Sequence, residues 1–98
     1  VVNQSLGKAK LRSRQQIIVD ILETALQGAE RRKIILKAKV NYTQFREVIN
    51  SLLVRGLITA TESPDGKIIL KTTSKGHMYV ETYRSMMGQH GAIISSQP

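Results

Sequence analysis

The chain contains no cysteine, and this absence removes three kinds of chemistry together. It can form no disulfide, offer no thiol nucleophile and build no metal site on thiolates. Histidine is almost as scarce. His77 and His90 stand thirteen positions apart, and no carboxylate lies at ligand spacing from either, so we expect no metal site.

Acidic residues are also few: 7 Asp plus Glu stand against 15 Lys plus Arg, and they are scattered along the chain. The paired carboxylates of general acid–base catalysis cannot be picked out from such a distribution. A phosphate-binding loop of the form GxxxxGK[ST] is missing as well. We therefore expect a protein that is not an enzyme, needs no cofactor and has no small-molecule substrate.

Long apolar runs are absent too. None approaches the roughly 18 residues that span a bilayer, and no apolar block directly follows the cations near the start, as it would in a signal peptide. These observations, with the lack of cysteine, favour a protein without membrane contact, located in the cytoplasm.

What the chain does have is positive charge, a formal +8 over 98 residues. This balance suits a polyanionic partner, first nucleic acid and second an anionic membrane. Residues 1–12 form a basic arm that contains Lys8, Lys10 and Arg12, and Arg14 follows. The arm could grip phosphates or could serve only as a soluble tail, and we favour the first reading.

The segment Asn41–Gly56 carries the clearest helix signals. Asn41 can cap the start while Gln44 reaches back to complete a capping box, and Gly56 can end the helix. Apolar residues at helical spacing predict one buried face, and polar residues of moderate length occupy the other. The predicted buried face consists of Phe45, Val48, Ile49, Leu52 and Leu53. The polar face consists of Thr43, Arg46, Glu47, Asn50 and Ser51.

Four further elements surround this helix. Ser13–Gly28 is predicted as a core helix that opens with a capping box between Ser13 and Gln16, and Arg31–Val40 as a short helix. Leu57–Thr73 reads as a hairpin, because its Ser-Pro-Asp-Gly sequence favours a turn between two β-rich runs. Thr73–Gly88 is predicted as a final helix, in which Gly76 costs about 1 kcal/mol relative to alanine.

This order of elements indicates a winged helix-turn-helix of the α+β class, mainly α. We expect a single domain organised as a basic arm at 1–12, a DNA-binding unit at 13–73, a dimerisation helix at 74–88 and a tail at 89–98. The third helix would enter the major groove and the hairpin would form the wing.

Several short motifs also resemble a known family. They are DIL in the first helix, A-x-V-N-Y-T-Q at the turn, LL-x-x-G-L-I before the hairpin and K-T-T-x-x-G before the last helix. Together they cover residues 12–84 and resemble the small archaeal winged-helix DNA-binding regulators, including the Sulfolobus ten-kilodalton chromatin-associated dimers.

The resemblance implies DNA binding, either transcriptional or architectural, and a homodimer formed through the last helix. Matched position by position, it points to Tyr42, Thr43, Gln44 and Arg46 as DNA-binding residues. One departure is that Gly88, Gly91 and Pro98 interrupt the stretch that forms a long coiled coil in the chromatin dimers. A shorter helix–helix contact is therefore expected here.

The sequence thus gives two sets of candidate residues. The proposed DNA contacts add second-helix cations for phosphates, Asn50 for base edges and one wing lysine: Arg31, Arg32, Lys33, Lys37, Lys39, Asn50 and Lys67. The proposed dimer surface is Tyr79, Tyr83, Met86 and Met87.

A sequence-specific regulator is the leading interpretation, because Asn, Gln, Thr and Arg share one helix face. A low-specificity chromatin protein, a winged-helix protein-interaction module and an RNA-binding winged helix are the alternatives.

Overall fold

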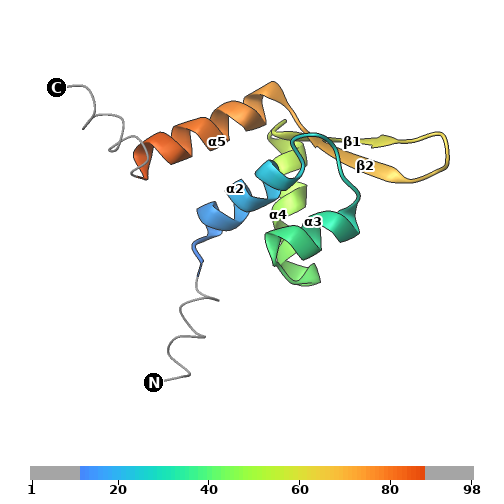
Figure 1. Cartoon of the computed structure of the whole chain (residues 1–98), viewed down its shortest axis with the longest axis horizontal. Helices are drawn as coiled ribbons and strands as arrows, with labels where there is room; N and C mark the ends of the chain where they lie inside the picture. Colours follow the sequence, from blue (N-terminus) through green and yellow to red (C-terminus); the bar gives the residue numbers. More distant parts are fainter. Residues whose placement is uncertain (1–11, 88–98) are drawn as a thin grey trace, which may run out of the picture.

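The computed structural model describes residues 12–87, which form four helices and one two-stranded antiparallel sheet (Figure 1). The elements are α2 (Arg14–Thr24), α3 (Arg31–Ala38), α4 (Tyr42–Val54), β1 (Ile58–Glu62), β2 (Ile68–Thr72) and α5 (Ser74–Met86). This is the winged-helix order, so the expected fold class is confirmed. Most of the predicted basic arm and the predicted tail lie outside the described residues.

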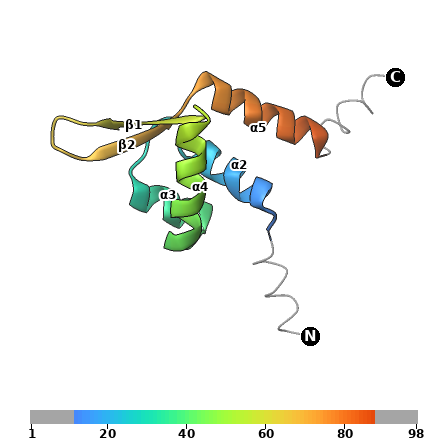
Figure 2. The same cartoon turned by 180° about the vertical axis from the view of Figure 1, so that it is seen from behind.

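The elements form three parts in space. α2, α3 and α4 cluster together, and the hairpin of β1 and β2 projects from one side of the cluster. α5 starts at the base of the hairpin and runs in the opposite direction, along α2 (Figure 1). Seen from behind, α4 lies in front of the other two helices of the cluster, and no other described element covers its outer side (Figure 2).

The beginning of α2 departs in part from expectation. The Ser13 hydroxyl accepts a hydrogen bond from the amide of Gln16 at 3.0 Å, as a helix cap should. The reciprocal half of the predicted capping box is missing, because the Gln16 side chain instead donates to Asp20 and accepts from the Tyr83 hydroxyl. A tertiary contact with α5 therefore replaces a local one.

The end of α2 also differs, since the helix stops at Thr24 and not near Gly28. The Ala25 carbonyl accepts the amide of Thr72, and Ala29 exchanges two hydrogen bonds with Leu70 at 2.8 and 2.9 Å. The chain after Thr24 therefore runs along the outer edge of β2. There Ala29 forms an isolated antiparallel β-bridge with Leu70.

Arg12 has a structural role that the sequence did not suggest. Its guanidinium pairs with the Asp20 carboxylate and donates to the carbonyl oxygens of Ala38 and Lys39. A cation at these carbonyls satisfies the free acceptors at the end of α3 and opposes its negative dipole end. The prediction that Arg12 belongs to a phosphate-gripping arm is therefore wrong, because its donors hold α2 and α3 together.

The turn between α3 and α4 follows from two residues. Lys39 ends α3 in the left-handed conformation, with φ of 57°. Asn41 then starts α4 with both halves of a capping box: its side chain accepts from the amide of Gln44 at 2.7 Å, and the Gln44 side chain accepts from the amide of Asn41 at 3.2 Å. The predicted helix-turn-helix is confirmed in this geometry.

The wing is a regular hairpin in which Ala60 pairs with Leu70 and Glu62 with Ile68. Its turn contains Gly66 at φ of 88°, a conformation that glycine adopts without steric cost. The predicted hairpin and its turn are confirmed.

A joint of threonine hydroxyls and backbone groups fixes the start of α5; we call it the threonine joint. The Thr72 hydroxyl donates to the Leu22 carbonyl at 2.7 Å, and the Thr73 hydroxyl donates to the Gly56 carbonyl at 2.7 Å while accepting from the amide of Gly76. The amide of Thr73 also donates to the carbonyl of Leu57. The threonine joint therefore connects α5 to α2 and to the residues that follow α4.

The core lies between the helix cluster and the base of the wing. Its fully buried side chains include Phe45, Ile21, Leu22, Ile34, Leu52, Ile58, Val19 and Val80. One residue of the predicted apolar stripe falls outside this core, because Leu53 is 37% exposed whereas Leu52 is 0% exposed. Leu53 is one position further around the helix than Leu52, so its side chain lies at the edge of the helix cluster and stays partly exposed.

Candidate nucleic-acid interface

The outer face of α4 presents polar side chains to solvent. Burial of Phe45, Val48, Ile49 and Leu52 on the inner side orients the helix, so its opposite side must face outward. That outward side carries exposed Thr43, Arg46, Glu47 and Asn50, as the sequence predicts, while Ser51 is half-buried. Arg and Asn can form bidentate hydrogen bonds with guanine and adenine in the major groove. The acidic Glu47 lies among them.

Three of the residues implied by the family resemblance have partners within the protein. The Arg46 guanidinium lies 5.7 Å from the centre of the Tyr42 ring, so cation–π attraction brings these side chains together at the start of α4. The Gln44 side-chain oxygen accepts the amide of Asn41 in the capping box. The side-chain amide oxygen of Gln44 is therefore engaged in helix capping, and the residue is half-buried.

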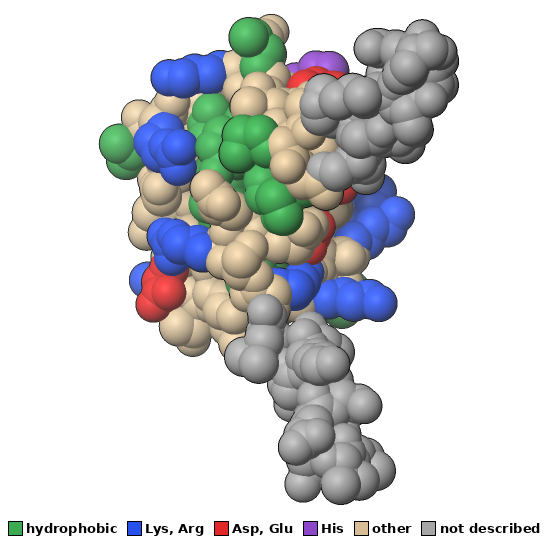
Figure 3. All heavy atoms as spheres, turned by 90° about the vertical axis from the view of Figure 1, so that its left-hand side faces the viewer, with side chains coloured by type: hydrophobic (Ala, Val, Ile, Leu, Met, Phe, Trp, Pro, Cys, Tyr) green, Lys and Arg blue, Asp and Glu red, His purple; other side chains and the backbone are tan. Residues whose placement is uncertain are grey.

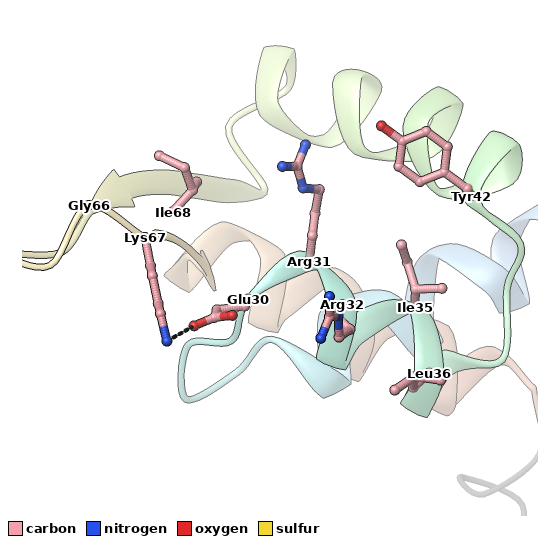
Figure 4. A pocket seen from close by; sticks show the side chains of 9 residues that line it. All are labelled: Glu30, Arg31, Arg32, Ile35, Leu36, Tyr42, Gly66, Lys67 and Ile68. Carbon is pink, nitrogen blue, oxygen red and sulfur yellow. Dashed lines mark ion pairs between the residues drawn. The ribbon is translucent and has the colours of Figure 1, made fainter.

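A basic groove separates α3, the start of α4 and the wing; we call it the α3–wing groove. It has a volume of about 940 Å³, and its lining includes Arg31, Arg32, Tyr42, Lys67 and Ile68. Arg31 extends from α3 into the space between the wing and α4 (Figure 4). This groove gathers two of the predicted phosphate-binding cations, the wing lysine and the exposed Tyr42 beside the polar face of α4.

The wing side of this groove carries charges of both signs. The Lys67 ammonium lies 3.4 Å from the Glu30 carboxylate, and both groups remain partly exposed (Figure 4). At the turn, the Ser63 hydroxyl and the amide of Lys67 donate to the Asp65 carboxylate, and these hydrogen bonds lower the pKa of Asp65. Asp65 is thus an anion at neutral pH, and the wing tip has a mixed charge.

The remaining cations of α3 take other directions. Lys33 and Lys37 line a different groove, on the outer side of α3, together with Leu36 and Ile69. Lys39 is exposed at the end of α3 and lines neither groove. The prediction from the sequence grouped these cations by their charge alone. In a helix, however, positions 31 and 35 share one face while positions 33 and 37 share another. This helical spacing could have predicted from the sequence which cations face which groove.

The predicted dimer residues also divide. Tyr79 and Tyr83 are half-buried and pack against the core, and the Tyr83 hydroxyl donates to Gln16. Met86 and Met87 are exposed. Met86 lines an apolar groove with Met78 and Val54, whereas Met87 lies beside α2.

Hydrophobic side chains gather on the side of the molecule opposite to the wing (Figure 3). The groove between α5, the end of α4 and the start of α2 has a volume of about 560 Å³ and includes Val54, Met78, Tyr79 and Met86 in its lining. Val54 is 86% exposed. An apolar surface of this kind is typical of a contact with another macromolecule.

Within residues 12–87, no group of three or more His, Cys, Asp or Glu side chains is arranged to hold a metal ion. None of the helices in this part of the chain is long and apolar enough to cross a bilayer.

The fold and the exposed face of α4 define a winged-helix protein. The sequence matches the family model described as winged helix-turn-helix over residues 11–90, so the chain belongs to this family. Among curated proteins, none matches the sequence.

Solved structures with the same fold include DNA-binding proteins. Sso10a-2, a DNA-binding protein from Sulfolobus solfataricus, is similar with a TM-score of 0.72 and 20% identity over 88% of this chain and 90% of that one. MepR from Staphylococcus aureus, a transcription regulator of the multidrug efflux pump MepA, has a TM-score of 0.67 and 18% identity over 97% and 71% of the two chains. The resemblance to small archaeal winged-helix proteins is thereby confirmed for the fold.

A mutant of MepR bound to an oligodeoxyribonucleotide also shares this fold, with a TM-score of 0.67 and 15% identity over 97% of this chain and 71% of that one.

Proposed function

We propose that this protein is a sequence-specific regulator that binds double-stranded DNA and reads the major groove with α4. The observation that carries the proposal is the exposed face of α4, where Thr43, Arg46 and Asn50 lie beside the basic α3–wing groove. Arg46 and Asn50 would contact base edges, while Arg31 and Arg32 would hold phosphates. The action is binding without catalysis, in the cytoplasm on the nucleoid.

Three lysines that the sequence predicts as DNA contacts, Lys33, Lys37 and Lys67, are not central to this proposal. Lys33 and Lys37 are left out of the phosphate set because they line the outer groove of α3. Lys67 has a smaller part because its ammonium already pairs with the Glu30 carboxylate at 3.4 Å. The printed descriptions of Sso10a-2 as DNA-binding and of MepR as a transcription regulator support the choice of duplex DNA as partner.

The decisive test compares phosphate and base contacts. We expect Arg32→Ala to weaken binding to all duplexes about equally and to reduce the log–log salt slope by about one, because one phosphate contact and its released counterion are lost. Arg46→Ala and Asn50→Ala should each cost about 1–3 kcal/mol on the preferred site and much less on random DNA. Binding isotherms at several salt concentrations, on a site selected from a random duplex pool, measure both effects.

Lys75→Ala is the matched control, because it removes the same charge from an exposed position on α5 that lines neither groove of α3. Equal weakening of both DNAs by Arg46→Ala would favour the chromatin alternative over the regulator. Unchanged affinity in all α4 and α3 variants would favour the protein-interaction alternative. Preference for single-stranded RNA in competition would point to the RNA-binding alternative.

We also propose a homodimer that forms through α5. The exposed Met78 and Met86, with Val54 and the half-buried Tyr79, supply the apolar surface. Tyr83 also lines this groove while its hydroxyl donates to Gln16 of α2, and Met87 lies beside α2 outside the groove. A small monomer would leave this area in contact with water, and pairing of two copies would bury it.

Sedimentation at micromolar concentration should therefore show twice the chain mass. Met78→Glu combined with Met86→Glu should produce monomers, because two charges would be buried at the contact. Met87→Glu is the control on the neighbouring face. A monomeric wild-type protein would contradict the proposal, and a persisting dimer in the double variant would place the interface elsewhere.

A further inference from the structure

The outer side of α3 carries a second groove, which we call the α3 outer groove. It has a volume of about 650 Å³ and lies between the loop at Gly28, the outer face of α3 and the side chain of Ile69 on β2. Leu36 and Arg32 form the ridge that separates it from the α3–wing groove, since both residues line both grooves. Of the proposed DNA contacts, Arg32 is the one that also lines this groove.

The floor of the α3 outer groove is apolar. Leu36 is 70% exposed and points away from α4 (Figure 4). Ile69 is half-buried, and it packs so closely against Gly28 that a Cβ at position 28 would lie 3.3 Å from its Cγ2 atom. Covering these side chains would remove apolar surface from water, which favours binding.

The rim of the same groove is positive. Arg32, Lys33 and Lys37 surround the floor, and all three are exposed. The one acidic side chain in the lining, Glu30, has its carboxylate 3.4 Å from the Lys67 ammonium. Cations around an apolar floor are complementary to a surface with a hydrophobic centre and an acidic border.

This combination discriminates among possible occupants. Duplex DNA offers phosphates to the cations but no apolar surface in reach of them, so it would leave Leu36 and Ile69 wet. A second copy of this chain carries the same charge of +8 and would meet the lysines with like charge. An amphipathic peptide with acidic side chains satisfies both the floor and the rim.

We propose that the α3 outer groove binds an acidic amphipathic segment of a partner protein. The apolar side chains of the segment contact Leu36 and Ile69, and its carboxylates pair with Lys33 and Lys37. Because these two lysines lie outside the α3–wing groove, the segment binds while α4 is occupied by DNA. The groove thus recruits a protein to the same molecule that holds the duplex.

The test uses a synthetic helical peptide of about four turns, with leucines on one face and Asp and Glu on the other. A scrambled peptide of identical composition, without a leucine face, is the control. Fluorescence anisotropy with the full chain should show at least about tenfold tighter binding of the amphipathic peptide. Amide resonances of Gly28, Leu36 and Ile69 should shift on binding, while that of Asn50 stays in place.

Variants locate the contact. Leu36→Ser and the double variant Lys33→Glu, Lys37→Glu should each weaken peptide binding at least about tenfold. Both change exposed residues, and unchanged thermal melting verifies that they fold. Ile68→Ser, which alters an exposed apolar residue in the α3–wing groove, and Lys75→Glu, which reverses a distant charge, should leave peptide binding unchanged.

Three results would overturn the proposal: equal binding of the scrambled peptide, wild-type affinity in the Leu36→Ser variant, or displacement of the peptide by saturating duplex. The last result would show that the outer lysines belong to the DNA contact. The anisotropy and variant measurements need no DNA, so failure of duplex binding would count against the regulator and leave those two arms of the test intact.

Discussion

Replacing Leu52 by alanine should lower the free energy of unfolding by about 2–5 kcal/mol. Its side chain is fully buried, so truncation loses apolar burial and leaves a cavity that the packed helices can close only in part. For a domain of this size, each kcal/mol corresponds to about 4–8 °C in melting temperature. Thermal unfolding followed by circular dichroism would measure the shift, and DNA binding would fall with the folded fraction.

Leu53→Ala is the matched control, because it deletes the same atoms one position further along α4 from a partly exposed side chain. It should cost well under half of the Leu52 effect. Melting temperatures that are equal in the two variants would mean that the buried face of α4 is assigned wrongly.

Gly76→Ala should destabilise the protein by about 3 kcal/mol, although helix propensity alone predicts a gain of about 1 kcal/mol. An added Cβ would collide with the carbonyl oxygen of Leu57 and come within 2.6 Å of Thr72 Cγ2. The carbonyl is backbone that already accepts the amide of Thr73, so it cannot swing aside cheaply. Urea unfolding of both proteins gives the sign directly.

Lys75→Ala provides the control for this substitution. It places alanine at the adjacent exposed position of the same helix, where only propensity acts, and should leave stability nearly unchanged. Thr72→Ser in the Gly76→Ala background should recover only part of the loss, since it removes the contact with Cγ2 but not the one with the carbonyl. Stabilisation by Gly76→Ala would show that α5 does not approach Leu57 closely.

Local signals account for most of the fold. The reciprocal cap of Asn41 and Gln44, the cap at Thr73 and the turn at Gly66 each depend on residues within three or four positions. Such interactions are readable from the sequence because both partners are neighbours in it. The buried face of α4 was readable for the same reason, except at Leu53, where the edge of the cluster decides exposure.

Long-range contacts account for the errors. In the sequence Arg12 looks like part of a basic arm, but α3 brings two carbonyls to it from residues 26 and 27 positions away. Gly76 looks like a weak point in a helix until Leu57 approaches it. The early end of α2 depends on hydrogen bonds from β2 to Ala25 and Ala29. None of these partners leaves a periodic mark in the sequence.

The candidate site shows the same division. The polar face of α4 follows from helical spacing, and its residues are exposed as predicted except Ser51, which is half-buried. The direction of the α3 cations does not follow from composition, which counts charges without assigning them to a face. Helical geometry places Arg31 toward α4 and the wing, and places Lys33 and Lys37 on the far side. The role of each cation remains a prediction.

The threonine joint fixes the orientation of α5 relative to α4, because it bonds the start of α5 to the residues that follow α4. Three bonds from Thr72 and Thr73 reach Leu22, Gly56 and Leu57, and no loose loop intervenes to absorb a rotation. In a dimer paired through α5, the two reading helices would therefore be held at one separation and one angular phase. Inserting about half a helical turn of DNA between two half-sites would put the second half-site on the wrong side of the duplex, and only a whole turn would restore it.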